Sequence, residues 1–282
     1  MTIFEAYNST KKKLEKCGIE DYVFEAKQII KHITGLSASE ILTHYNRKLT
    51  EFQENNLVAL VHQREVRYPL QYIFGEWDFY GRPYYVGPGV LVPRADTEIL
   101  AEQCIKMLNG RENAEILDLC SGSGCIGITL ALECKNSNVS LVEKYTEASR
   151  YLEKNIIRNK ADNAKFIKGD IFEAVASDKK YDLIVSNPPY VSDMTEISPE
   201  TSFEPETALK AEDEGLEFYK AITRLYKNSL KPDGMLCFEV GINQADKVLD
   251  IMKAEGFEDI TVTKDLNGID RVVSAVRKTE VN

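Results

Sequence analysis

The sequence has few of the side chains that bind metal ions. Its three histidines, His32, His44 and His62, all lie in the amino-terminal part, and none of its six cysteines belongs to a Cys-x-x-Cys pair. A structural zinc site usually draws four such ligands from short, regular spacings. We therefore predict that the protein holds no metal and that its thiols are reduced and mostly buried.

Long apolar runs are also missing. No segment approaches the roughly 18 apolar residues of a membrane-spanning helix, and the amino terminus lacks the apolar core of a secretion signal. Internal repeats and low-complexity tracts are absent as well. These features predict a cytoplasmic protein with no membrane partner.

Positive charge is scarce for a general nucleic-acid binder. The chain has 35 Lys or Arg against 45 Asp or Glu, a formal net charge of −10. Residues 1–75 carry 10 basic and 9 acidic side chains. Residues 76–282 carry 25 basic and 36 acidic side chains, a net charge of −11. The acidic part favours a partner with basic surfaces over direct binding of nucleic acid, although acidity also serves solubility alone.

What the sequence does contain fits two soluble domains. Its 282 residues are 43% hydrophobic and 28% charged. In residues 1–72, three Ser or Thr residues are each followed three positions later by Glu or Gln, which is the spacing of a capping box at a helix start. These residues are Thr2, Ser37 and Thr50. Asp21 is a candidate cap for a further helix that ends at Gly35, and we predict a helical bundle domain.

Residues 73–92 change character. The aromatic segments 77–80 and 83–86, separated by a Gly-Arg pair, predict a β-hairpin. The Gly-Pro-Gly run at 87–89 then breaks the chain. We interpret this stretch as a linker between domains.

In residues 93–282, apolar strand-like segments alternate with helical ones. We predict strands at 115–119, 139–143, 166–168, 182–186, 235–239, 260–264 and 271–277, and helices at 97–108, 125–133, 146–159, 214–230 and 243–254. Alternation with short connections implies an α/β domain with a mostly parallel, doubly wound, Rossmann-like sheet.

A glycine loop joins the first predicted strand of this domain to the next helix. Its glycines let the backbone approach a ligand, and the free N–H groups at the helix start attract an anion. Glu143 ends the next strand, 19 residues after the second glycine, where doubly wound folds present a carboxylate to ribose hydroxyls. The loop also fits a dinucleotide fingerprint, so alone it does not distinguish NAD from S-adenosylmethionine. The candidate cofactor-binding loop residues are Cys120, Ser121, Gly122, Ser123 and Gly124.

The run Asn187-Pro188-Pro189-Tyr190 indicates a specific chemistry. It follows an apolar strand, at the edge where α/β sheets bind ligands. Two prolines remove the backbone donors and leave an arc of oxygen acceptors, which suits a planar NH2 group, and Tyr190 can stack on that group. This is the acceptor motif of enzymes that methylate the NH2 of glutamine, adenine or cytosine. Taken alone, the same residues also fit a tight turn.

Two further features favour S-adenosylmethionine over NAD. Asp118 lies inside the strand before the glycine loop, as it does in methyltransferases. Asp170 and Ile171 follow the third strand, where an acid and an apolar residue would hold adenine. A dehydrogenase gives no reason for this acid and for the Asn187 motif at successive strand ends.

With these residues placed, the chain resembles the release factor glutamine methyltransferases of the PrmC/HemK family over nearly its whole length. The resemblance includes PLQYIFG at 69–75, VGPGVLVPR at 86–94, FEP at 203–205 and KDLNGIDRVV at 264–273. The first two blocks separate this family from DNA methyltransferases.

The resemblance implies a class I S-adenosylmethionine-dependent methyltransferase fold with seven strands and an antiparallel final hairpin. It implies an amino-terminal domain that helps to grip the protein substrate. It implies S-adenosylmethionine as cofactor, with S-adenosylhomocysteine as product. The contacts would come from Cys120–Gly124, Glu143, Ile171 and Asn187. It also implies that Asn187–Tyr190 hold the glutamine of the Gly-Gly-Gln motif of class-one release factors, a protein methylation in translation termination. We expect a monomer.

Some positions depart from the family pattern, and some roles stay open. Cys120 stands where the family usually has Gly, Glu143 replaces the commoner Asp, and Ala211 and Glu212 stand where paired glycines are frequent. None of these changes removes a group that the chemistry needs. Arg94 and Glu98 fit either a place near the substrate channel or a salt-bridged helix start. The alternative functions are an adenine-specific nucleic-acid methyltransferase and a non-catalytic binding module that keeps the fold.

Overall fold

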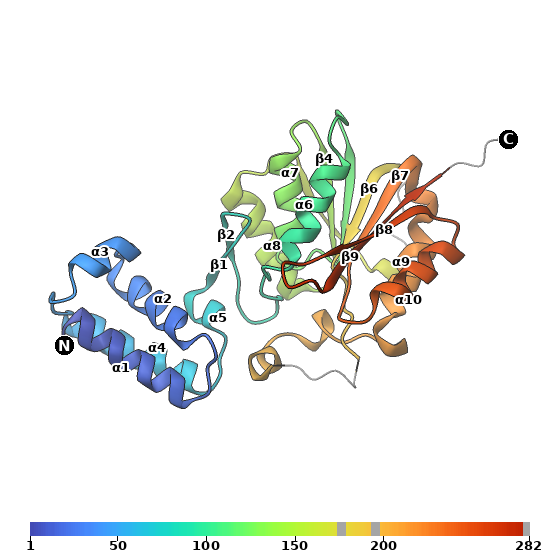
Figure 1. The fold of residues 1–282 in the computed structure, drawn as a ribbon. Coiled ribbons are helices and arrows are strands. Elements are labelled where there is room, and N and C mark those ends of the chain that lie inside the picture. Colours follow the sequence, from blue (N-terminus) through green and yellow to red (C-terminus); the bar gives the residue numbers. More distant parts are fainter. Residues whose placement is uncertain (174–178, 193–197, 279–282) are drawn as a thin grey trace. The chain divides into compact units, whose positions relative to one another are not determined.

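The computed structural model describes residues 1–173, 179–192 and 198–278, and the chain divides into two units (Figure 1). One unit comprises Met1–Gly75 together with Ser198–Phe203, and the other comprises Glu76–Ile197 and Glu204–Asn282. The helical domain ending at 72, the 73–92 linker and the 93–282 catalytic domain remain predictions about functional parts of the chain.

The first unit is helical. Its helices are α1 (Ile3–Lys16), α2 (Tyr22–Thr34), α3 (Ala38–Thr43), α4 (Glu51–Glu65) and α5 (Leu70–Phe74). The three predicted capping boxes at Thr2, Ser37 and Thr50 are confirmed, with both reciprocal hydrogen bonds present in each. Asp21 precedes α2, but its side chain makes no capping hydrogen bond, so that detail of the prediction is wrong; Gly35 ends α2 in the left-handed conformation.

The segment Ser198–Phe203 belongs to the helical unit through a buried cation. Arg64 is 3% exposed and donates to the carboxylates of Glu25 and Glu200, at 2.7 Å to each. Phe203 packs edge-on against Tyr68, with ring centroids 5.3 Å apart. The chain thus leaves the second unit after the Asn187 motif, joins the helical unit, and returns at Glu204.

The second unit contains a seven-stranded sheet in the order β5-β4-β3-β6-β7-β9-β8. Its strands are β3 (Glu115–Leu119), β4 (Asn138–Glu143), β5 (Ala164–Lys168), β6 (Tyr181–Ser186), β7 (Leu230–Glu239), β8 (Glu258–Lys264) and β9 (Asp270–Arg277). Strands β5, β4, β3, β6 and β7 are parallel, and β9 is antiparallel to both of its neighbours. The predicted fold class, with an antiparallel final hairpin, is confirmed.

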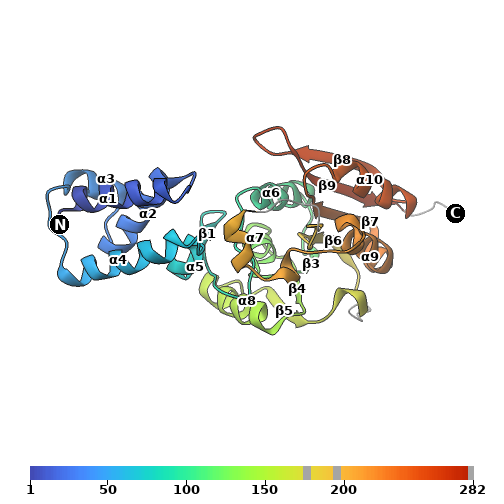
Figure 2. The same cartoon turned by 90° about the horizontal axis from the view of Figure 1, so that it is seen from below.

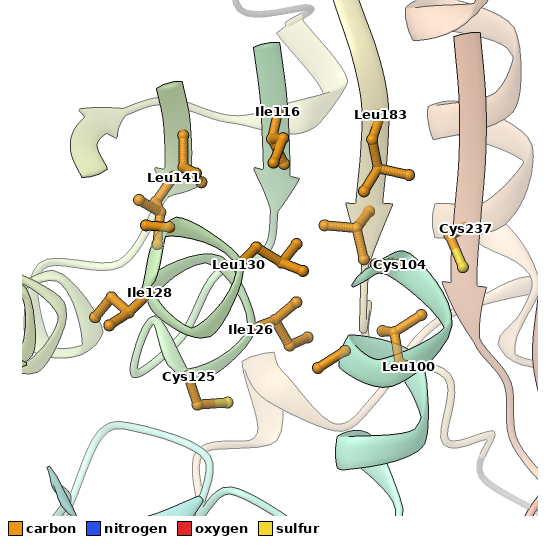
Figure 3. Close-up of a cluster of buried hydrophobic side chains, with 14 of the residues drawn as sticks. Leu100, Cys104, Ile116, Cys125, Ile126, Ile128, Leu130, Leu141, Leu183 and Cys237 are labelled. Carbon is orange, nitrogen blue, oxygen red and sulfur yellow. The ribbon is translucent and has the colours of Figure 1, made fainter. Parts of the chain in front are cut away.

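Helices cover both faces of this sheet, as Figure 2 shows for α7 and α9. On one face, α6 (Thr97–Met107), α7 (Cys125–Glu133) and α8 (Thr146–Asn159) contribute to one apolar cluster. On the other face, α9 (Glu217–Tyr226) and α10 (Ala245–Ala254) contribute to a second cluster. Alternate strand residues divide between the two: Ile116 and Leu183 point toward α6 and α7 (Figure 3), whereas Leu117 and Ile184 lie in the second cluster.

The predicted hairpin is also confirmed, as β1 (Glu76–Phe79) and β2 (Arg82–Tyr85). Phe79 and Tyr84 are buried in the first of the two apolar clusters. The predicted helix 214–230 is wrong at both ends, because Leu230 already belongs to β7, and because Glu214 and Gly215 have positive φ angles of 55° and 84° that no α-helix accommodates. The helix therefore begins only at Glu217.

Candidate cofactor and acceptor site

The order of the strands creates the site. The chain runs outward from β3 to β4 and β5, then crosses back to β6 on the other side of β3. Ligands bind at such a switch point, outside the carboxyl ends of the strands. The loops after β3 and β6, which carry the glycines and the Asn187 motif, therefore lie side by side.

A cavity opens at this edge, with about 950 Å³ of space when its open side is included. Among the predicted site residues, the lining includes Cys120, Ser121, Gly122, Ser123, Glu143, Asp170, Ile171, Asn187 and Pro189. Gly124, Pro188 and Tyr190 do not line it, so the structure brings together most of the predicted set but not all of it.

The glycine loop is held in a backbone shape that few residues adopt. Cys120, Gly122 and Gly124 have φ angles of 59°, 55° and 82°. A Cβ atom on Gly124 would lie 2.3 Å from Cδ1 of the buried Leu152, so a larger residue there would have to displace that side chain. The left-handed conformation at Cys120 is one that glycine adopts most readily, which fits the expectation of a glycine here from the family resemblance.

Asp118 supports the loop from below rather than lining the cavity. Its Oδ2 accepts a hydrogen bond of 3.0 Å from the N–H of Gly127, in the first turn of α7. A Cβ on Gly127 would lie 2.8 Å from that oxygen, so the glycine permits the contact. Burial raises the pKa of Asp118 to about 7, although the Gly127 N–H opposes the shift.

Glu143 joins the ends of β3 and β4. One carboxylate oxygen accepts from the N–H of Gly122 at 2.9 Å, and the other accepts from Tyr145 at 2.8 Å. The side chain lines the cavity although the residue is only 6% exposed. Each oxygen keeps a further lone pair for a ligand hydroxyl.

The segment after β5 supplies an acid, Asp170, and one of two aromatic rings at the cavity. Burial alone would raise the pKa of Asp170, but the Lys144 ammonium at 2.7 Å and the N–H of Phe172 hold it below its usual value. Phe172 and Phe218 lie with ring centroids 5.0 Å apart, and both line the cavity. This aromatic pair was not predicted, because Phe218 lies on α9, far away in the sequence.

The Asn187 side chain has a defined orientation. Its Nδ2 donates to Oγ1 of Thr97 at 3.3 Å, and both residues line the cavity. One of the two N–H groups of the amide is thus occupied by Thr97, and Oδ1 is the side-chain atom that can accept. Pro188 and Pro189, which are buried, offer no backbone donor beside it.

Tyr190 is fixed from three sides. Its hydroxyl donates to Oε1 of Glu239 at 3.3 Å, and its carbonyl accepts from Nε2 of Gln244 at 3.0 Å. A Cβ on Gly241 would lie 3.0 Å from the ring, and one on Gly215 would lie 2.2 Å from the Tyr190 carbonyl oxygen. No local sequence pattern indicated that Glu239, Gln244 or these two glycines are neighbours of the motif.

The comparisons with known proteins agree with this geometry. Residues 5–75 match the family described as the PrmC N-terminal domain, and residues 95–202 match the Methyltransferase small domain. A release factor glutamine methyltransferase of Fusobacterium nucleatum subsp. nucleatum is 39% identical over 275 residues, which span 96% of this chain and 78% of the relative. One from Geobacter sulfurreducens is 35% identical over 96% of this chain and 95% of its own length.

The chain belongs to the release factor glutamine methyltransferase family. The fold has a wider distribution, since a methyltransferase from Pyrococcus furiosus superposes with a TM-score of 0.52 at 17% identity, over 82% of this chain and 100% of that one.

In this family member, Arg94 and Glu98 have different partners. Arg94 lines the cavity and forms an ion pair with Glu204, whose other oxygen accepts from the N–H of Val92 at 3.0 Å. Glu98 accepts from the N–H of Tyr80 at 2.7 Å, which ties α6 to the hairpin. Glu98 thus lies in the first turn of α6 with a main-chain N–H as its hydrogen-bond donor, whereas Arg94 both forms an ion pair and lines the cavity.

Two wall segments of this methyltransferase were not predicted as site residues. Val90 and Val92 line the cavity from the segment before α6, and Pro205, Thr207 and Ala208 line it from the segment after Phe203. In the sequence, only the family resemblance of blocks 86–94 and 203–205 pointed to these two segments, because neither contains residues typical of a binding site.

Neither a metal centre nor a membrane span is found among the described residues. In residues 1–173, 179–192 and 198–278, no three His, Cys, Asp or Glu side chains are grouped to hold a metal ion. No helix in this part of the chain is both long enough and apolar enough to cross a bilayer.

Proposed function

We propose that the chain transfers the methyl group of S-adenosylmethionine to the side-chain amide nitrogen of the glutamine in the Gly-Gly-Gln motif of class-one release factors. Its curated relatives are named release factor glutamine methyltransferases. The observation that carries the proposal is the orientation of Asn187, whose Nδ2 is occupied by Thr97 so that Oδ1 can accept a substrate N–H.

The residues around the cavity fit S-adenosylmethionine. Gly122 has no neighbouring atom within 4 Å of the place where a Cβ would stand, so the loop leaves room for a ligand. We assign the ribose hydroxyls to Glu143, the adenine amine to Asp170, and the adenine faces to Ile171 with Phe172 and Phe218. When bound, the cofactor supplies a sulfonium-activated methyl group.

The residues of the acceptor motif would orient a poor nucleophile. The amide nitrogen of glutamine is weakly nucleophilic because its lone pair is delocalised into the carbonyl. Asn187 Oδ1 accepts one of its N–H groups, aims the nitrogen at the methyl carbon, and stabilises the positive charge that develops on it. The Pro188 carbonyl is the proposed acceptor of the second N–H group, although Pro188 itself does not line the cavity. No strong general base is required, since the methylated nitrogen is acidic enough to lose its proton to a carbonyl or to water.

The nucleic-acid alternative is not favoured. An adenine methyltransferase that acts on duplex DNA must extrude its base and hold the strand in a basic channel. Residues 76–282 instead carry a net charge of −11. The family membership points to the same conclusion, because the relatives are named for release factors.

Transfer of labelled methyl groups tests the proposal. We expect the full chain to label a full-length class-one release factor and not duplex DNA. Asn187→Ala should lower this labelling by at least about 100-fold, because the acceptor oxygen is lost. Circular dichroism and calorimetric binding of S-adenosylmethionine verify that the variant is folded. Undiminished labelling by the variant, or labelling of DNA alone, would contradict the proposal.

A further inference from the structure

Glu239 is a buried carboxyl beside the acceptor motif to which the proposed chemistry assigns no role. It is the last residue of β7, and the register that pairs Ser186 with Phe238 places Asn187 and Glu239 at neighbouring strand ends. The residue is only 2% exposed. A carboxyl group at this depth is costly to ionise, so its presence at the site needs a physical reason.

The contacts of Glu239 converge on the acceptor motif. The Tyr190 hydroxyl donates to Oε1 at 3.3 Å. The hydroxyl of Thr97, a residue 2% exposed, lies close enough to the carboxyl to lower its pKa. Oε2 is buried and has no hydrogen-bond partner among the described residues. Arg271, the cation that acts on the carboxyl, forms its ion pairs with Asp96 and Asp265 instead.

Thr97 connects this carboxyl to Asn187. Its Oγ1 accepts the Asn187 Nδ2 hydrogen at 3.3 Å, so its own single proton must point elsewhere. An ionised carboxylate accepts hydrogen bonds and donates none, so it draws the Thr97 proton toward itself. A neutral carboxyl or an amide at position 239 can donate to Thr97 instead, and then nothing keeps the Asn187 NH2 turned toward Thr97.

We propose that Glu239 is a positioning residue of the acceptor site, which through Thr97 makes Asn187 present its oxygen to the substrate amide. The inference rests on the proposed function. A flipped Asn187 would oppose its own NH2 to that of the substrate, and two donors cannot bond to each other. The orientation of Asn187 thus depends on the charge of a residue that does not itself touch the substrate.

Several charged and titratable groups face Glu239. Arg271 on β9 lies 3.1 Å from both Asp96 and Asp265, and the Tyr219 hydroxyl on α9 donates to the Glu239 main-chain oxygen at 2.9 Å. Burial raises the pKa of Glu239 to about 7, which Thr97, Arg271 and Tyr190 oppose and Asp96 reinforces. The ionised fraction therefore changes across the neutral range, and turnover should rise with pH there.

The test compares four variants of the full chain. In Glu239→Gln and Thr97→Val we expect kcat with a full-length release factor to fall roughly 10- to 100-fold, because the substrate amide would no longer be held in line with the methyl group. The affinity of Glu239→Gln for S-adenosylmethionine should stay within about three-fold, since Glu239 does not line the cavity. Thr97→Ser keeps the hydroxyl and should retain most of the activity. Thr223→Val is the matched control, because Thr223 is also fully buried and its Oγ1 has no hydrogen-bond partner.

Two readouts separate positioning from a merely structural role. The rise of kcat with pH near neutrality should disappear in Glu239→Gln, and combining it with Thr97→Val should add little, because both act on one chain of contacts. An unchanged kcat and pH profile in Glu239→Gln would overturn the inference. So would a loss of kcat that only follows a loss of cofactor binding and thermal stability.

A third readout needs no turnover. In free protein, the side-chain amide signal of Asn187 in a ¹⁵N correlation spectrum, identified by its absence in Asn187→Ala, should shift and exchange faster in Glu239→Gln and Thr97→Val but not in Thr223→Val. A signal that stays unchanged in both would refute the positioning role. A wild-type protein that fails to methylate release factors would refute the proposed function, and this spectrum would still decide the inference.

Discussion

At the scale of single residues, the site depends on atoms that are missing as much as on those present. A Cβ atom on Gly124 would lie 2.3 Å from Leu152, and one on Gly127 would lie 2.8 Å from the Asp118 carboxylate, so both positions favour glycine. Gly215 and Gly241 leave room in the same way for Tyr190. The cavity edge and the acceptor motif are therefore shaped by glycines that contact protein rather than ligand.

Gly124→Ala tests this view. The added methyl would lie 2.3 Å from Leu152, so we expect a loss of about 2–4 kcal/mol in the free energy of unfolding and a loss of cofactor affinity. Gly110→Ala is the control, since Gly110 has the same φ of 82° with nothing within 4 Å. It should lose only about 1 kcal/mol through its backbone conformation. Equal losses in chemical denaturation would contradict the packing explanation.

At the scale of elements, the glycine loop, the Asn187 motif and the strand alternation could be read from the sequence because each is local. The helix start at Glu217 could not, since Glu214 and Gly215 take left-handed angles in a segment that packs against Tyr190. The sequence did not predict either that Ser198–Phe203 belongs to the helical unit. That attachment depends on Arg64, more than 130 residues away in the sequence.

The Arg64–Glu200 pair gives a prediction for that segment. Burial opposes ionisation of Glu200, but Arg64 and Arg67 hold its pKa below the usual value, so its contribution exists at neutral pH and disappears as the pH falls through the lowered pKa. Glu200→Ala should cost about 1–3 kcal/mol at pH 7, because it removes one of two partners of a buried guanidinium.

The control for this pair is Glu206→Ala. Glu206 is 78% exposed and pairs with Lys210, so its loss should cost about 0.5 kcal/mol or less. Thermal unfolding at pH 7 and at pH 3 distinguishes the two variants. A Glu200→Ala effect that is no larger than that of Glu206→Ala, or that persists undiminished at pH 3, would show that the ion pair does not hold the segment.

At the scale of the whole molecule, buried acids give stability an unusual dependence on pH. Asp118 and Glu239 both have pKa values raised to about 7, above their unfolded values, so the folded state keeps protons that the unfolded state releases. Their contribution to the free energy of unfolding is therefore lost as pH rises from about 4 to 7. Carboxylates with lowered pKa values, such as Asp182 and Glu200, act in the opposite sense.

The variant Asp118→Asn removes the pH-dependent contribution of one of these two buried acids. The amide keeps an oxygen acceptor for the Gly127 N–H but cannot titrate. The stability of the variant minus that of the wild type should therefore increase with pH between 4 and 7, by up to about 4 kcal/mol. Chemical denaturation at several pH values measures it. A difference that stays constant across this range would mean that Asp118 is ionised in the folded protein throughout.

The most direct test of the account as a whole is tandem mass spectrometry of a full-length class-one release factor incubated with the protein and S-adenosylmethionine. The account predicts one added methyl group, located on the side chain of the glutamine in Gly-Gly-Gln. A methyl group on any other residue, or an unmodified release factor in the presence of bound cofactor, would contradict it.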